Sequence, residues 1–190
     1  MIEQKYLDLL RELTADQSPH SGRTLLEHLT GTYDLLESWG NSHEVCVAGL
    51  FHSIYGTQYY TVQSTSLADR QRIAEVIGSR AEELAFLFCT TDRMSFVTQA
   101  AAPAPKLVDT KTGQPVPVSQ DVLGELIEIE AANRIEQFAP ETVSPELIEA
   151  MTFMLKAGDR HMTLGAKQAF ARALAEYPLE EPQASKQTTD

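Results

Sequence analysis

The 190-residue sequence predicts an all-α fold, a bundle of about seven or eight helices with one long loop or small hairpin. Apolar residues recur at intervals of three and four over most of the chain, which is the spacing of one helix face. Ser, Thr or Pro precedes several of these segments and Gly follows others, as expected at helix starts and ends. The length suits one domain with a single core. We place it at residues 1–178, followed by a disordered polar tail at 179–190.

Five helices are predicted before residue 95. They span roughly residues 2–13, 24–39, 42–54, 67–77 and 79–90. Residues 16–22 form a loop and residues 56–66 a polar stretch without helical period. Gly40 ends the second helix and Ser42 caps the third. Ser79 and Glu82 have the spacing of a capping box at the start of the fifth.

The helical period disappears between residues 95 and 119. Residues 107–118 favour a small hairpin or an ordered loop, and their prolines confine any strand to a sheet edge. A loop of this length inside a compact domain is often a lid or a binding loop. Three more helices are predicted at about residues 120–138, 145–158 and 163–177, the first of them capped by Ser119.

Composition excludes several function classes. The net charge is −12 and no Lys/Arg cluster exists, so we expect no nucleic-acid partner. A few arginines in a pocket still attract a small anion locally. No run of 18 apolar residues predicts a membrane span, and the N-terminus lacks a signal-peptide pattern, which predicts a cytoplasmic protein. Cys46 and Cys89 lie in apolar helical contexts typical of buried free thiols. The oligomeric state stays open.

Two histidines are the first candidates for chemistry. His52 ends an apolar run and shares a helix face with Ala48 and Gly49, while His28 lies at the edge of the buried face of the preceding helix. A buried imidazole needs partners for both ring nitrogens or serves as a metal ligand. One interpretation is a pair of hydrogen-bonded core histidines. The other is a catalytic pair, since imidazole suits a general base near neutral pH.

Ligand-binding candidates lie near both histidines. Asn133 is on an apolar helix face, where an amide is costly unless it has a partner in a neighbouring helix or a ligand. A hydroxyl-rich turn follows His52 and supplies hydroxyl groups for a polar ligand. An anion contact is expected from Arg134 and also from Arg93, unless both arginines form surface ion pairs. The predicted ligand-binding residues are Ser53, Tyr55, Thr57, Asn133 and Arg134.

This order of residues resembles the HD-domain superfamily of helical metal-dependent phosphohydrolases. It is similar in particular to the hydrolase domain of the stringent-response alarmone enzymes. His28 matches the first histidine of that pattern, His52 the histidine of the His-Asp pair, and residues 131–134 the late Ala-Asp-Arg helix. Residues 80–92 resemble the segment that follows the pair. The resemblance covers residues 24–137 and implies a helical fold with a metal-dependent site.

Two departures change what the resemblance implies. Ser53 and Asn133 stand where the family has its two aspartate ligands. Hard divalent cations prefer anionic oxygen, so two imidazoles alone would hold them poorly. We therefore predict no metal ligand, or, if a metal is present, the set His28, His52 and Glu130. Further carboxylate or imidazole candidates are His20, Glu27 and Asp92. The turn at residues 51–57 also resembles an uncharacterised HD-like family with a His-Ser-x-Tyr-Gly-Thr motif.

Three functions follow from these observations. The first is a pocket that binds or acts on a small polar or anionic ligand through His28 and His52, with no strong metal site. The second is a metal-dependent enzyme with altered ligands, either a phosphohydrolase or an iron oxygenase of the same superfamily. The third is a non-catalytic partner protein that makes contacts through its acidic surface and the loop at residues 95–119. The cofactor and the identity of the ligand stay open.

Overall fold

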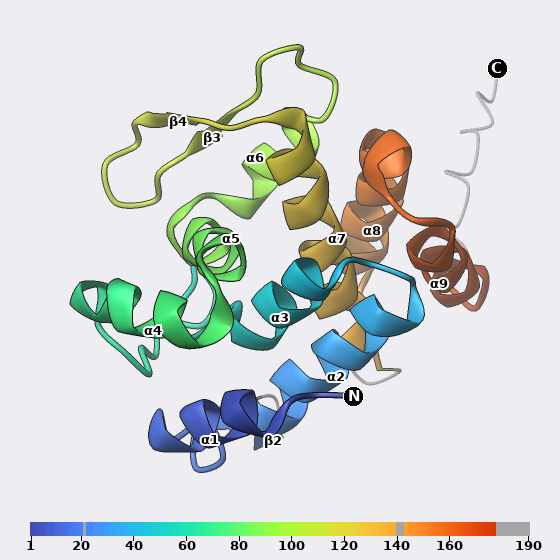
Figure 1. Cartoon of the computed structure of the whole chain (residues 1–190). Coiled ribbons are helices and arrows are strands. Elements are labelled where there is room, and N and C mark those ends of the chain that lie inside the picture. The colour runs from blue at the N-terminus through green and yellow to red at the C-terminus, as the bar shows by residue number, and fades with distance from the viewer. Residues whose placement is uncertain (21, 140–142, 178–190) are drawn as a thin grey trace, which may run out of the picture.

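Two helices that are buried on almost every side form the centre of the molecule. The computed structural model describes residues 1–20, 22–139 and 143–177. In it, α3 (His43–Phe51) buries seven consecutive residues and α7 (Gln120–Glu136) buries ten. A helix that is apolar all round belongs in the interior of a domain. In Figure 1 both lie in the middle of the bundle, with the remaining elements around them.

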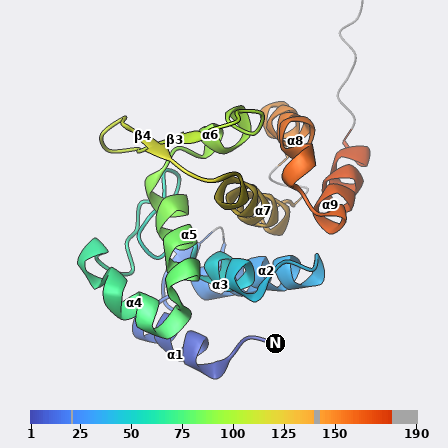
Figure 2. The ribbon, with the colours of Figure 1, turned by 45° about the horizontal axis from the view of Figure 1, so that its top comes forward.

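The other helices surround this centre. The helix α2 (Leu25–Ser38) packs on α3 and α7, and α5 (Ser79–Thr90) packs on the other side of α3. In Figure 2, α6 (Arg93–Thr98) and α8 (Pro145–Gly158) lie along one side of α7. The outer helices are α1 (Gln4–Glu12), α4 (Arg70–Ile77) and α9 (Leu164–Ala175).

Two short antiparallel hairpins complete the architecture. Strands β1 (Pro19–His20) and β2 (Arg23–Thr24) pair just before α2. Strands β3 (Lys106–Val108) and β4 (Pro115–Pro117) pair with Leu107 opposite Val116. The second hairpin confirms the prediction for residues 107–118, and its prolines lie on a two-stranded edge.

The all-α prediction is confirmed, with nine α-helices in the described parts of the chain. The predicted helix starts at Ser42, Ser119 and Ser144 are correct, because each of these hydroxyls accepts a backbone N–H three residues on. Cys46 and Cys89 are buried free thiols. No helix in the described ranges is long and apolar enough to cross a bilayer. The predicted tail at 179–190 lies outside the described residues.

Two local predictions were wrong. The segment from residue 95 was expected to be non-helical, yet α6 extends to Thr98. It is only six residues long and is capped by the Asp92 side chain, so it shows no full helical period. The expected capping box at Ser79 does not form, because Glu82 is bound by Tyr55 and Arg70 instead. The backbone enters α5 through Gly78, whose φ of 89° is unfavourable for any other residue.

Candidate functional site

The local structure brings His28 and His52 into contact. A capping box between Thr24 and Glu27 starts α2 one turn before His28. His52 is the C-cap of α3. Gly49 allows the two helices to approach closely, because a Cβ there would lie 2.3 Å from the Leu36 side chain. The two rings are fully buried and meet edge to face, with centroids 5.0 Å apart.

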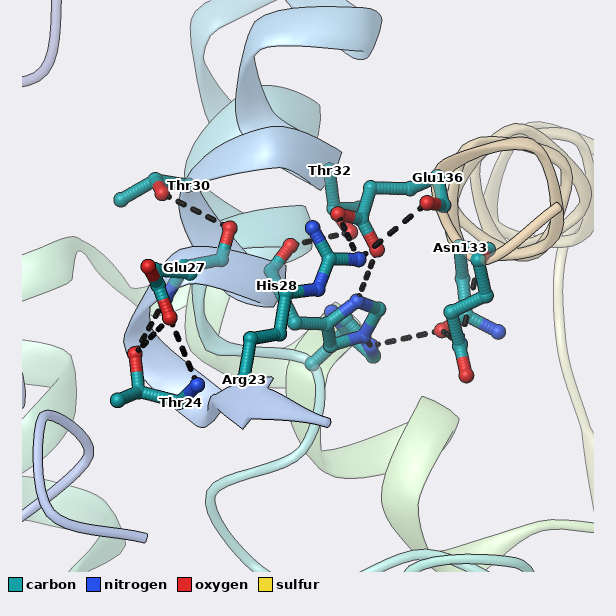
Figure 3. Close-up of polar contacts among 10 residues, drawn as sticks. Arg23, Thr24, Glu27, His28, Thr30, Thr32, Asn133 and Glu136 are labelled. Atoms are coloured by element: carbon teal, nitrogen blue, oxygen red, sulfur yellow. Dashed lines mark hydrogen bonds and ion pairs between the residues drawn. The ribbon is translucent and has the colours of Figure 1, made fainter. Parts of the chain in front are cut away.

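Each imidazole turns its Nε2 atom toward the other. The two Nε2 atoms are 3.2 Å apart, and His52 Nε2 is also 3.2 Å from the side-chain oxygen of Asn133. The Nδ1 atoms point outward to oxygen partners. His52 Nδ1 donates to the carbonyl oxygen of Gly49 at 2.6 Å, and His28 Nδ1 contacts the carboxylate of Glu136. Figure 3 shows Glu136 and Asn133 reaching from α7 toward His28 on α2.

The protonation of His52 follows from its surroundings. Burial, and then the neighbouring His28 ring, hold the pKa of His52 well below its usual value, so the ring is neutral near pH 7. Its single proton lies on Nδ1, because the Gly49 carbonyl can only accept. Asn133 Oδ1 already accepts from Gln137 Nε2 at 2.8 Å. Two lone-pair atoms, His52 Nε2 and Asn133 Oδ1, therefore converge on the space beside His28 Nε2.

Glu136 links the histidine pair to an arginine. Its side chain is 5 % exposed and contacts both His28 and Arg23, and Arg23 also donates to the Glu136 carbonyl oxygen at 3.3 Å. Figure 3 shows the Arg23 guanidinium beside the Glu136 carboxylate. Gly31 leaves room for this carboxylate, because a Cβ there would lie 2.7 Å from Glu136 Oε1. The pairing is thus built by the packing of α2 against α7.

A cavity of about 940 Å³ lies in front of this layer. Neither His28 nor His52 is among the described residues that line it, whereas Ser53, Asn133 and Glu136 form part of its wall. The remaining lining residues come from β1, β2, the loop after α3, α6, the end of α7 and the start of α8. They are Pro19, Arg23, Thr57, Tyr59, Tyr60, Arg93, Met94, Glu130, Arg134, Gln137, Phe138, Ala139, Glu146, Leu147 and Ala150.

Two further arginines of this wall share one carboxylate. Arg93 Nη1 is 3.3 Å from Glu130 Oε2, and Arg134 Nε is 2.7 Å from Glu130 Oε1. The contact between Arg134 and Glu130 is an ion pair without hydrogen-bond geometry, because Arg134 Nε and Glu130 Oε1 are both buried without a hydrogen-bond partner. Arg93 is only 8 % exposed, its guanidinium lies over the rings of Phe88 and Tyr59, and its Nε has no hydrogen-bond partner in the described structure. This wall therefore keeps two unused donors, the Nε atoms of Arg93 and Arg134.

The inner layer has several features of a metal site. Ligating histidines commonly donate their second nitrogen to a carboxylate or a backbone carbonyl, as His28 and His52 do here with Glu136 and Gly49. The donor set of two imidazoles and the Asn133 amide oxygen suits a metal that accepts nitrogen, such as zinc or iron, better than magnesium or calcium. Within the described ranges, no three His, Cys, Asp or Glu side chains gather around one point.

The structure separates the predicted site residues into groups. Ser53, Thr57, Asn133 and Arg134 line the large cavity. Tyr55 does not, because its hydroxyl donates to Glu82 at 2.9 Å and it lines a second cavity of about 190 Å³ instead.

The carboxylates and other candidates proposed as metal ligands have different partners. Glu130 contacts the two arginines and the Asn133 amide. Glu27 and Asp92 cap helices. The side chain of His20 lies outside the described residues.

Sequence reasoning missed Glu136, Arg23 and Gln137. Glu136 and Gln137 follow Asn133 by three and four residues, so they lie on the same helix face, and that spacing was a usable signal. Arg23 carried no such signal, because its partner Glu136 is 113 residues away.

Comparison with known proteins adds one match. Residues 9–93 match a family model described as a domain of unknown function, DUF6817. The match runs from α1 to the first residue of α6, and so includes both histidines but none of α7. No curated protein and no solved structure matches the chain.

Proposed function

We propose that this chain binds a small anionic molecule in the large cavity and that the histidine pair, through Glu136, supplies its acid–base chemistry. The observation that carries the proposal is Arg93, a buried guanidinium that lines the cavity with an unpartnered Nε. Leaving a buried donor unpaired is costly. A ligand oxygen at this place would remove that cost.

The charges of the lining support the same conclusion. The chain as a whole carries −12, yet the formal charges balance in this cavity, where three arginines, at positions 23, 93 and 134, offset three glutamates, at positions 130, 136 and 146. Arg93 and Arg134 share Glu130, so two guanidinium groups lie together at one carboxylate. This place in the lining is more favourable to an anion than the rest of an acidic chain. Arginine also presents paired donors that match carboxylate and phosphate oxygens.

Glu136 connects the two layers. It lines the cavity and also contacts His28 Nδ1, while His28 Nε2 faces the neutral His52. The carboxylate can take a proton from a bound ligand without either imidazole entering the cavity, while the His28 N–H that it accepts keeps it in position. In this arrangement Glu136 is the group that meets the ligand, and the histidine pair orients it.

Calorimetric titration with inorganic phosphate tests the binding step. We expect the wild type to bind and Arg93→Gln to bind about tenfold more weakly or worse, since a hydrogen bond to a charged group contributes about 1.5–3 kcal/mol. Arg134→Gln, at a partly exposed side chain, should also weaken binding and guards against misfolding of the first variant. Arg80→Gln is the matched control, because Arg80 pairs with Glu83 and Glu125 away from the cavity. Equal affinities in all four proteins, or no binding, would refute the proposal.

A metal-dependent enzyme of the HD superfamily, either a phosphohydrolase or an iron oxygenase, is the second candidate. It is favoured by the convergence of His28 Nε2, His52 Nε2 and Asn133 Oδ1, three residues that the resemblance also groups. His28, His52 and Asn133 would hold the metal, which would supply Lewis-acid chemistry for a substrate in the cavity. Adding Zn²⁺, Mn²⁺ or Fe²⁺ should then raise the melting temperature of the wild type but not of His52→Gln. A zero shift with all three metals would exclude this candidate.

A further inference from the structure

The large cavity is lined by apolar as well as charged side chains. Glu130, Arg134 and Glu136 come from α7 and Arg93 from the start of α6. The apolar lining residues are Met94 on α6, Leu147 and Ala150 on α8, and Phe138 just after α7. In Figure 2, α6 and α8 are neighbours on the same side of α7. A ligand that contacts both kinds of side chain needs an apolar body as well as a charged group.

Two large apolar side chains are left exposed at this cavity. Tyr59 is 66 % exposed and Met94 is 48 % exposed, and both line the cavity. Scattered exposed apolar residues are ordinary on a protein surface. Here, however, the two belong to one concave site that also holds the buried Arg93. Covering them with an apolar ring would remove their surface from water.

The backbone at Tyr59 is held in place by its own turn. Thr57 Oγ1 accepts the backbone N–H groups of Tyr59 and Tyr60 at 3.3 and 3.0 Å, and the Thr57 N–H donates to the Tyr60 carbonyl at 2.6 Å. Gly56 enters this turn with a φ of 75°. The Arg93 guanidinium lies 5.1 Å from the centre of the Tyr59 ring. The turn thus brings an aromatic side chain next to the guanidinium.

We propose that the ligand of this cavity is an aromatic anion, with its charged group at Arg93 and Arg134 and its ring against Tyr59. The inference rests on the proposed anion binding and extends it to the class of ligand. A ring stacked beside Tyr59 continues the column that Phe88, Arg93 and Tyr59 already form. Met94 and Leu147 border the same space and contact the edge of the ring. Aromatic pairing of this kind increases affinity about two- to tenfold.

Two phosphonates with the same head group distinguish binding of the anionic group from binding of the aromatic ring. Phenylphosphonate and methylphosphonate share the anionic group and resist hydrolysis, and they differ only in the ring. We expect the wild type to bind phenylphosphonate at least about tenfold more tightly. Tyr59→Ala should lose most of that preference, measured as the ratio of its affinities for the two phosphonates. Val62→Ala is the control, because Val62 is exposed on the same loop but is not among the residues that line the cavity.

Each outcome has a defined meaning. Equal affinities of the two phosphonates for the wild type would overturn the aromatic proposal and leave anion binding in place. Failure of both to bind would overturn the proposed function and this inference with it. A phenyl preference that survives in Tyr59→Ala would contradict the role of Tyr59. Because Tyr59 is largely exposed, its replacement should leave folding intact, which circular dichroism checks.

Discussion

The histidine layer and the arginine wall are adjacent, yet their polar atoms are paired to different degrees. In the inner layer, His52 Nδ1 donates to the Gly49 carbonyl and His28 contacts Glu136 and His52. In the outer wall, Arg93 keeps an unpartnered Nε and shares one carboxylate with Arg134. Polar groups that are hydrogen-bonded to one another stabilise the fold. Groups with unused donors are the ones that a ligand can satisfy.

This difference divides the roles between the two layers. The inner layer fixes α2, α3 and α7 relative to each other and positions Glu136. The outer wall recognises the ligand. Variants of the first layer should therefore affect the free energy of unfolding, and variants of the second should affect affinity with little change in stability.

The largest expected effect on stability comes from Glu136→Ala. This change removes the carboxylate shared by His28, which is fully buried, and Arg23, which is partly exposed. Breaking a buried pair from one side costs about 3 kcal/mol. Urea unfolding measures the loss. Glu146→Ala, at an exposed position on the rim of the same cavity, is the control and should change stability by less than about 0.5 kcal/mol. Similar small losses for both variants would show that the inner layer is not structural.

A smaller effect concerns pH and His52. Because burial lowers its pKa in the folded state, the unfolded chain binds the extra proton more readily. The free energy of unfolding therefore has its full value above about pH 6.5, and it falls as the pH decreases below that. The contribution of His52 to this fall is at most about 1.4 kcal/mol per pH unit, which is the effect of one proton.

The pH experiment compares slopes of stability against pH. His52→Gln, which has no titrating ring, should show a flatter slope than the wild type by that amount. Thr32→Val changes a buried hydroxyl that donates to the His28 carbonyl and removes no titrating group, so it should retain the wild-type slope. An unchanged slope in His52→Gln would mean that His52 is protonated in the folded protein.

The sequence predicted the inner layer better than the outer wall. His28, His52 and Asn133 were recognisable because each interrupts an apolar helix face, and the structure brings all three together. Helix starts at Ser119 and Ser144 were recognisable because a cap is a local feature. The pairing of Arg23 with Glu136 was not recognisable, because it joins chain segments more than 100 residues apart.

Competition between partners explains the remaining errors. Glu82 has the right spacing to cap its own helix, but Arg70 binds both of its carboxylate oxygens and removes it from that role. Tyr55 lies in the predicted ligand turn, but its hydroxyl donates to the buried carboxylate of Glu82 instead. The local spacing of residues along the sequence does not indicate that Arg70 and Tyr55 are the partners of Glu82. Only the packing of α4 and α5 brings these groups together.

The most direct measurement is a crystal structure of the wild type with phenylphosphonate bound. The account predicts phosphonate oxygens within hydrogen-bond distance of Arg93 Nε and of the Arg134 guanidinium, with the phenyl ring against Tyr59. The histidine pair should remain closed behind Asn133. A phosphonate bound only at other surface arginines such as Arg80, with the cavity holding water at saturating ligand, would contradict the claim that the arginine wall is the ligand site.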